Sequence, residues 1–178
     1  MNSRFSPSRR RFLKVGVLGS VALAAAGGGI ALSRKPGPRA GSLWLQADDW
    51  SVLQAIVPVM LAGALPDDPP HRTSAINQVV SGVDLTVAHF PPAVRAEIRQ
   101  LLWLLESSFL RPIVTGLWSD WSSVGDEDIR SFLQRWNRSR LDLLRVGYTA
   151  LHDLIVGAWY ANPLSWQRIH YPGPPVLS

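Results

Sequence analysis

Four histidines are the side chains of this sequence that most readily suggest catalysis or metal binding. None of them has a second histidine or a carboxylate at the spacing of a known metal motif; they are His71, His89, His152 and His170. His152 and Asp153 are neighbours in the sequence and are therefore expected to point to different faces of a helix. We interpret the histidines as isolated surface or capping residues, and predict no metal and no cofactor in this chain.

The acidic pairs are explained by helix capping. Asp48-Asp49, Asp67-Asp68 and the acids 126–128 lie in loops or at the starts of helical segments, where carboxylates accept hydrogen bonds from free backbone N–H groups. The absence of cysteine excludes disulfides, thiolate metal sites and a cysteine nucleophile. The sequence also lacks a phosphate-binding glycine loop, a Gly-x-Ser-x-Gly elbow and a Cys-x-x-Cys-His haem motif. It therefore predicts no catalysis by this chain alone.

The positive charge of the chain is concentrated near its N-terminus. The formal net charge is +5, from 18 basic and 13 acidic residues. Five basic residues precede Val15 and three more lie between positions 34 and 39, which leaves ten basic against 13 acidic residues in the rest. Because this remainder has no basic excess to neutralise phosphates, no nucleic-acid partner is predicted.

The first 33 residues have the three-part layout of an export signal. A basic region is followed by the uncharged segment Val15–Leu32 and then by further basic residues. The basic region resembles the twin-arginine translocation motif; the matching residues are Ser8, Arg9, Arg10, Phe12, Leu13 and Lys14. We therefore expect the twin-arginine translocase to export this chain to the periplasm. Cleavage after Ser33 and retention as an inner-membrane anchor both remain open.

The body is expected to be an all-α, small irregular bundle of about five helices. Apolar residues recur at helical spacing, and no window alternates as a strand would. The expected helices are 47–65 with a kink at Pro58, 73–89, 92–111, 126–136 and 139–159. We divide the chain into a signal helix or anchor (1–33), a linker (34–46), a helical domain (47–162) and an extended tail rich in proline and aromatic residues (163–178).

The chain has eight tryptophans, a large number for so small a body. Trp103, Trp136 and Trp159 lie on apolar helix faces and are expected in the core. Trp118 and Trp121, in a polar loop, and Trp166, in the tail, have no evident helix face to bury them. Aromatic residues placed in this way are enriched at protein interfaces, although they also pack over the ends of bundles.

The ending of the chain completes a pattern that resembles a known family. A twin-arginine leader, a helical body and the ending L-x-x-L-x-x-G-A-W-Y-A-N-P-x-S-W-x-x-I-x-Y-P-G-P-P, from Leu151 to Pro175, resemble the gluconate 2-dehydrogenase subunit 3 family. The resemblance is specific in the last third of the chain and general in the helical middle. His170 departs from it, because many members carry a small residue there.

The resemblance implies a non-catalytic small subunit of a periplasmic dehydrogenase complex. Its large subunit would be a glucose–methanol–choline type oxidoreductase that holds FAD, and a multihaem cytochrome c subunit would accompany some complexes. The small subunit would also escort the large subunit through the translocase. The candidate contact residues are Trp118, Trp121, Trp159, Tyr160, Trp166, Tyr171, Pro172, Gly173 and Pro174.

Two other functions stay open. The chain could be a stand-alone periplasmic helical protein whose tail closes a small-molecule pocket. It could also be an enzyme that uses His152, Asp153 and Tyr148 in a buried cleft. The first function requires a formed pocket in the free monomer. The second requires that His152 titrates near neutral pH and that its substitution abolishes a measured activity.

Overall fold

A computed structural model describes residues 37–168 of the chain. The predicted leader and the tail from residue 169 onward lie outside these residues. The described part is helical and contains no strand, as predicted. Its helices are α2 (Ala47–Met60), α3 (Pro69–Ala88), α4 (Pro92–Glu106), α5 (Leu110–Thr115), α6 (Asp126–Asn137), α7 (Asp142–Tyr160) and α8 (Pro163–Arg168).

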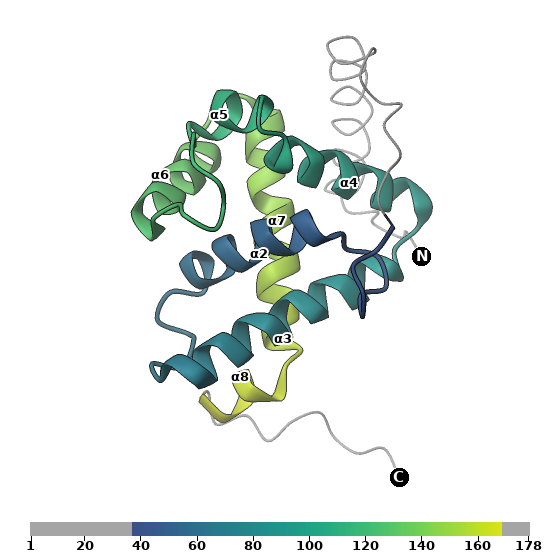
Figure 1. Ribbon diagram of the computed structural model, residues 1–178, viewed down its shortest axis with the longest axis vertical. Helices are drawn as coiled ribbons and strands as arrows, with labels where there is room; N and C mark the ends of the chain where they lie inside the picture. Colours follow the sequence, from purple (N-terminus) through teal and green to yellow (C-terminus); the bar gives the residue numbers. More distant parts are fainter. Residues whose placement is uncertain (1–36, 169–178) are drawn as a thin grey trace, which may run out of the picture.

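The helices pack around two central helices, α2 and α7. α2 contacts α3, α4, α6 and α7, and α7 runs behind α2 and α3 along the long axis of the molecule (Figure 1). The valine-rich face of α3 packs against α2 and α7, so the stripe Val79, Val80, Val83 and Val87 is buried as its spacing predicts. Phe132 and Trp136 of α6 meet edge to face in the same core, with ring centroids 5.5 Å apart.

Several predicted boundaries are wrong for local reasons. α3 begins at Pro69 rather than at Thr73, because Asp68 caps it by accepting a hydrogen bond from the backbone N–H of His71 at 3.3 Å. The single helix expected over 92–111 is two helices, separated at Ser107, whose ψ of 116° leaves the helical range. The helix expected from residue 139 begins at Asp142, and the residue before it, Leu141, makes no side-chain cap.

The two segments flanking the predicted helical domain also differ from expectation. Residues 163–168 form the helix α8 instead of an extended tail. Residues 37–46, expected to be a linker, pack on the body: Leu45 is completely buried and Trp50 donates its indole N–H to the Ser42 hydroxyl at 2.8 Å. The folded domain therefore begins before α2 and continues past α7.

Candidate interaction surface

We call the C-terminal pattern from Leu151 to Pro175 the signature, and its described part forms a tight corner between α7 and α8. The Asn162 side-chain oxygen accepts a hydrogen bond from the Leu164 N–H at 2.9 Å, and the Asn162 carbonyl accepts one from the Ser165 hydroxyl at 2.7 Å. Pro163 begins α8, where its missing N–H and fixed φ suit a first helical turn. The Asn-Pro-x-Ser sequence therefore has a local role: it ends one helix and starts the next.

The corner is fixed against α3. The Asn162 side-chain amide donates to the Gln78 side-chain oxygen at 2.9 Å, across 84 positions of sequence. A Cβ built on Gly82 of α3 would lie 3.1 Å from the Ala158 Cβ, so a glycine and an alanine let α3 and α7 approach closely at this point. The orientation of the corner is thus set by the body of the domain.

Several residues of the signature lie at the surface of this corner, among them Gly157, Tyr160 and Trp166. Tyr160 is 55% exposed, and Trp166 is half-buried with its indole N–H donated to the Tyr160 carbonyl at 2.8 Å. Gly157 lies one turn before Tyr160, is exposed, and has no atom within 4 Å of the place a Cβ would occupy. Internal packing therefore does not require a glycine at this position. We call Gly157, Tyr160 and Trp166 the corner surface.

Two of the predicted contact residues belong to the core instead. Trp159 is 3% exposed, because it lies on the face of α7 that packs into the body. Trp121 is 6% exposed: its loop folds back so that the indole N–H donates to the Leu105 carbonyl at 2.9 Å and the ring meets Phe132 edge to face. Neither side chain is exposed in this structure, so both are left out of the corner surface.

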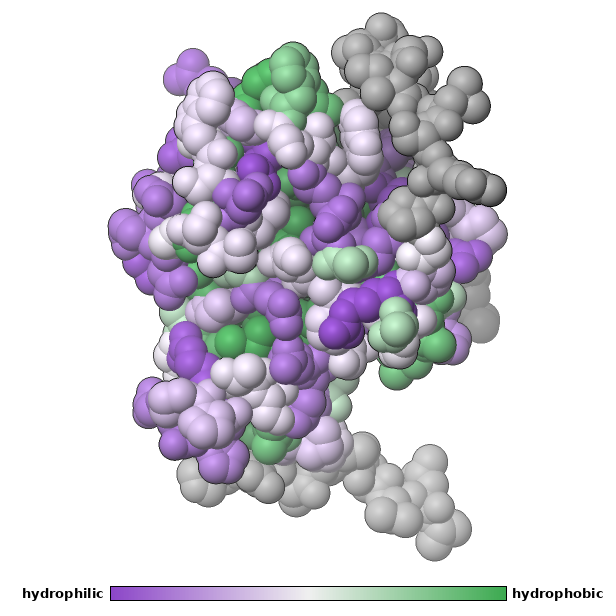
Figure 2. Space-filling model, viewed as in Figure 1, coloured by the Kyte–Doolittle hydropathy of each residue, from purple (hydrophilic) through white to green (hydrophobic). Residues whose placement is uncertain are grey.

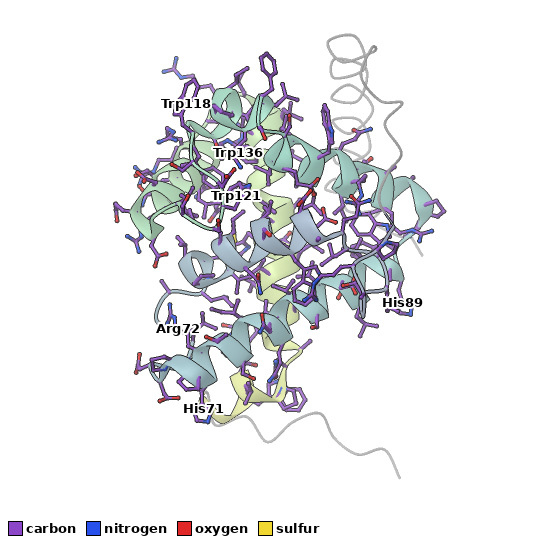
Figure 3. The ribbon with its side chains drawn as sticks, in the orientation of Figure 1. His71, Arg72, His89, Trp118, Trp121 and Trp136 are labelled. Atoms are coloured by element: carbon purple, nitrogen blue, oxygen red, sulfur yellow. The ribbon has the colours of Figure 1, made fainter. Side chains whose placement is uncertain are left out.

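Trp118 is exposed as predicted, but it lies far from the corner surface. It is 84% exposed and lies beside α5, at the end of the molecule where α7 begins (Figure 3). The corner lies where α7 ends, and the 19 residues of α7 span about 28 Å. Trp118 therefore does not share one surface with Tyr160 and Trp166. Tyr171, Pro172, Gly173 and Pro174 lie outside the described residues, as do all the motif residues of the leader.

Trp103 also departs from expectation. It was expected in the core with Trp136 and Trp159, which are 2% and 3% exposed, but it is 46% exposed on α4. The apolar stripe of α4 is carried by Ile98, Leu102 and Leu105, and Trp103 lies beside it. An aromatic residue next to a stripe is indistinguishable from one within it when several neighbouring positions are apolar.

The histidine group considered for catalysis lies on the surface. His152 and Asp153 do approach each other, contrary to expectation, with the His152 Nδ1 and the Asp153 carboxylate 3.1 Å apart. Adjacent residues on a helix differ by about 100° in direction. The side chains of His152 and Asp153 nevertheless turn toward each other, so that their polar atoms meet. Tyr148 stacks on His152 with ring centroids 5.9 Å apart. Because His152 and Asp153 are both exposed, this group has no buried cleft around it.

A buried ionic group, which no spacing in the sequence reveals, connects α2 with α4. The Arg99 guanidinium donates to both oxygens of the fully buried Asp49 carboxylate, at 2.9 and 2.7 Å, and packs over the Trp44 ring at 3.9 Å from its centroid. Glu106 lies nearby, and its Oε1 is buried with no hydrogen-bond partner among the described residues. Burial, and then the adjacent Asp49 carboxylate, raises the pKa of Glu106 to about 8.

A second buried carboxylate holds the segment before α2. Asp84 of α3 is 4% exposed, and its two oxygens accept hydrogen bonds from the backbone N–H groups of Leu43, Trp44 and Leu45 at 2.7 to 2.9 Å. Its position inside the valine stripe of α3 was the available sequence signal, since an acid on an apolar face needs buried partners. Asp84 and Arg99 together hold the segment before α2 against the body of the domain.

A shallow depression open to solvent lies on α6, lined by Ser131, Gln134, Arg135 and Arg138, and it is remote from α8. In residues 37–168, no group of three or more histidine or acidic side chains could hold a metal ion. Within the same range, no helix is both long and apolar enough to cross a bilayer.

Comparisons with protein-family models, with curated proteins and with solved structures find no match to this chain.

Proposed function

We propose that this chain is the non-catalytic small subunit and export escort of a periplasmic FAD-dependent dehydrogenase complex that oxidises a sugar, sugar acid or alcohol. The large subunit, of the glucose–methanol–choline oxidoreductase type, holds the FAD. A multihaem cytochrome c is the candidate third subunit. The twin-arginine motif and the C-terminal signature both support this proposal.

The corner surface is the observation that carries the proposal. Its residues are signature residues that the fold does not bury, while their neighbours Trp159 and Ser165 are buried and serve the domain itself. An exposed helix glycine costs about 0.5 to 1 kcal/mol relative to alanine, and Gly157 has no internal contact that offsets this cost. A partner backbone that approaches α7 at Gly157 would account for it.

The corner also joins the described domain to the rest of the signature. α8 ends at Arg168, and the remaining residues up to Pro175 follow directly. We assign the contact with the large subunit to the corner surface together with Tyr171, Pro172, Gly173 and Pro174. Trp118 is not part of this contact, because it lies at the other end of α7.

Purification of the chain with its native partners tests the proposal. The full chain, tagged after Ser178, is expressed in its own host and isolated from both periplasm and membranes. We expect a larger polypeptide to co-purify and the eluate to have a flavin absorption spectrum. Substitution of Tyr160 and Trp166 by alanine should remove both, whereas the matched variant Leu85→Ala, an exposed residue on α3, should retain them. A colourless single chain from the unsubstituted protein would contradict the proposal.

Export is tested separately from assembly. Replacing Arg9 and Arg10 by lysine should leave both the chain and its flavoprotein in the cytoplasm, because the twin-arginine receptor reads the arginines as an address. Periplasmic dehydrogenase activity that is unchanged in this variant would contradict the escort role while leaving the subunit role intact.

A further inference from the structure

An exposed apolar group occupies the end of the molecule opposite the corner surface. Phe109 and Ile113 are 78% and 70% exposed. Phe109 is the N-cap residue of α5 and already has helical backbone angles, so it and Ile113, four residues on, lie on the same side of the segment. Trp118 lies at the same end. Figure 2 shows apolar atoms gathered at this tip of the molecule, over α5. We call Phe109, Ile113 and Trp118 the apolar tip.

The backbone beneath the apolar tip is held by hydrogen bonds from α6 and from within α5. The Trp136 indole N–H donates to the Val114 carbonyl at 2.8 Å, and the Thr115 hydroxyl donates to the Arg111 carbonyl and accepts from the Leu117 N–H. Arg135 donates to the Thr115 carbonyl at the end of α5. The exposure of the tip is therefore a feature of a fixed segment whose backbone groups are satisfied from below.

Positive charge adjoins the apolar tip. Residues 135–145 contain four of the ten arginines that follow position 40 and one acid, Asp142, which pairs with Arg145. Trp136 connects this stretch with α5, since its ring also lies against Gly147 in the second turn of α7. Leu141 and Leu143, which are 65% and 42% exposed, add apolar surface at the start of α7. Arg138 and Arg140 are exposed between α6 and α7.

We propose that the apolar tip and the adjacent arginines form a binding site for an anionic bilayer surface. Aromatic and aliphatic side chains that project from a rigid base enter the boundary between headgroups and acyl chains, and arginines beside them bind lipid phosphates. The net charge of the body is negative, so the concentration of arginine at this end is local and complements an anionic surface. Symmetric pairing of two copies through this end would place the same arginines opposite one another, and this like-charge repulsion disfavours a dimer.

This site leaves the other end of the molecule free. A domain held to a bilayer by its apolar tip presents its corner surface away from the membrane, because the two lie at opposite ends of α7 (Figure 1). Binding through this tip is a property of the folded domain, independent of any protein partner and of the leader.

The absence of cysteine makes a site-specific test possible in the full chain. A single cysteine introduced by Ile113→Cys carries a polarity-sensitive fluorophore, and Tyr160→Cys provides the matched label at the corner surface. Vesicles of phosphatidylglycerol with phosphatidylethanolamine, with and without bromine on their acyl chains, are compared with phosphatidylcholine vesicles. Because the label reports its own position, membrane binding by the leader does not produce the signal.

The expected result is a blue shift and bromine quenching of the label at position 113 on anionic vesicles, with neither change at position 160. Reversal of charge by Arg138→Glu with Arg140→Glu should lower the fraction of label inserted by about tenfold, whereas Arg72→Glu, at the start of α3, should not. A label at 113 that stays in water when the protein is bound to vesicles would overturn the proposal. So would insertion that is equal on neutral vesicles, or a label buried by dimerisation without vesicles.

Discussion

Arg99 and Asp49, fifty positions apart in the sequence, form a two-oxygen ion pair in which the carboxylate is fully buried. Asp49 also accepts the Gln46 backbone N–H at 2.6 Å, which completes the capping box of α2. One carboxylate therefore caps α2 and ties it to α4. The pair joins the segment that follows the leader to the interior of the domain.

Removal of Arg99 should destabilise the domain strongly. Arg99→Met keeps an unbranched apolar side chain but removes the guanidinium that packs over Trp44. It leaves Asp49 buried without its cation, which costs about 3 kcal/mol in the free energy of unfolding. Urea denaturation monitored by tryptophan fluorescence measures the loss. The comparison is Arg130→Ala, which removes an exposed pair with Glu127 and should cost less than about 1 kcal/mol. Equal losses in the two variants would show that the buried pair contributes little.

Glu106 should make the stability of the domain fall as the pH rises from about 4.5 to about 8. Its pKa rises from 4.5 to about 8 on folding, so the folded state retains a proton that the unfolded state releases. The stability contributed by protonated Glu106 is thus complete below about pH 4.5 and is lost as the pH rises to about 8. The causes are burial, the Asp49 carboxylate and, to a smaller extent, Asp48, opposed by the charge of Arg99.

The variant Glu106→Gln isolates this effect. Glutamine resembles the protonated acid and does not titrate, so the part of the slope between pH 4.5 and 8 that comes from Glu106 should disappear. At pH 8 and above the variant should unfold at a higher temperature than the unsubstituted protein. Thermal unfolding curves that remain parallel across this pH range would contradict the assignment.

Asp84→Ala should loosen the segment before α2. It removes the acceptor of three backbone N–H groups, at Leu43, Trp44 and Leu45, and each buried donor left unsatisfied costs about 1 to 3 kcal/mol unless water reaches it. Hydrogen exchange measured on peptides from residues 37–46 should accelerate in this variant. Exchange in α6, which Asp84 does not contact, should change only as much as global stability does. Unchanged protection of residues 43–45 would mean that the rest of the segment holds them.

Much of the helical architecture could be predicted from the sequence. Apolar periodicity identified the faces of α3 and α6, and the prolines before α4 and within α8 marked real boundaries. α8 itself was missed because Asn162-Pro163 reads as a stop, while the same pair also caps and starts a short helix. Local sequence does not distinguish a chain that ends at a proline from one that turns there and becomes helical again.

The interaction surfaces could be predicted only in part. Trp118 and Tyr160 are exposed as expected, but Trp121 is buried because its loop returns to the Leu105 carbonyl. That return is a long-range packing event, and the polar residues around Trp121 give no sign of it. The ionic group of Asp49, Arg99 and Glu106 depends likewise on how α2 meets α4, so periodicity within either helix could not reveal it.

Gly157→Ala should separate the stability of the domain from its capacity to assemble. The added Cβ meets no atom within 4 Å, so the substitution should raise the free energy of unfolding by about 0.5 to 1 kcal/mol through the backbone entropy of glycine. Under the proposed function, the same methyl group should weaken co-purification of the flavoprotein. Gly147→Ala on the same helix is the matched control: its Cβ would lie 2.8 Å from the Trp136 ring, so it should lower stability and leave the corner surface unchanged. If Gly157→Ala stabilised the domain and retained the flavoprotein fully, the glycine would have no role in partner contact, and the contact would have to be sought at Tyr160, Trp166 and the tail.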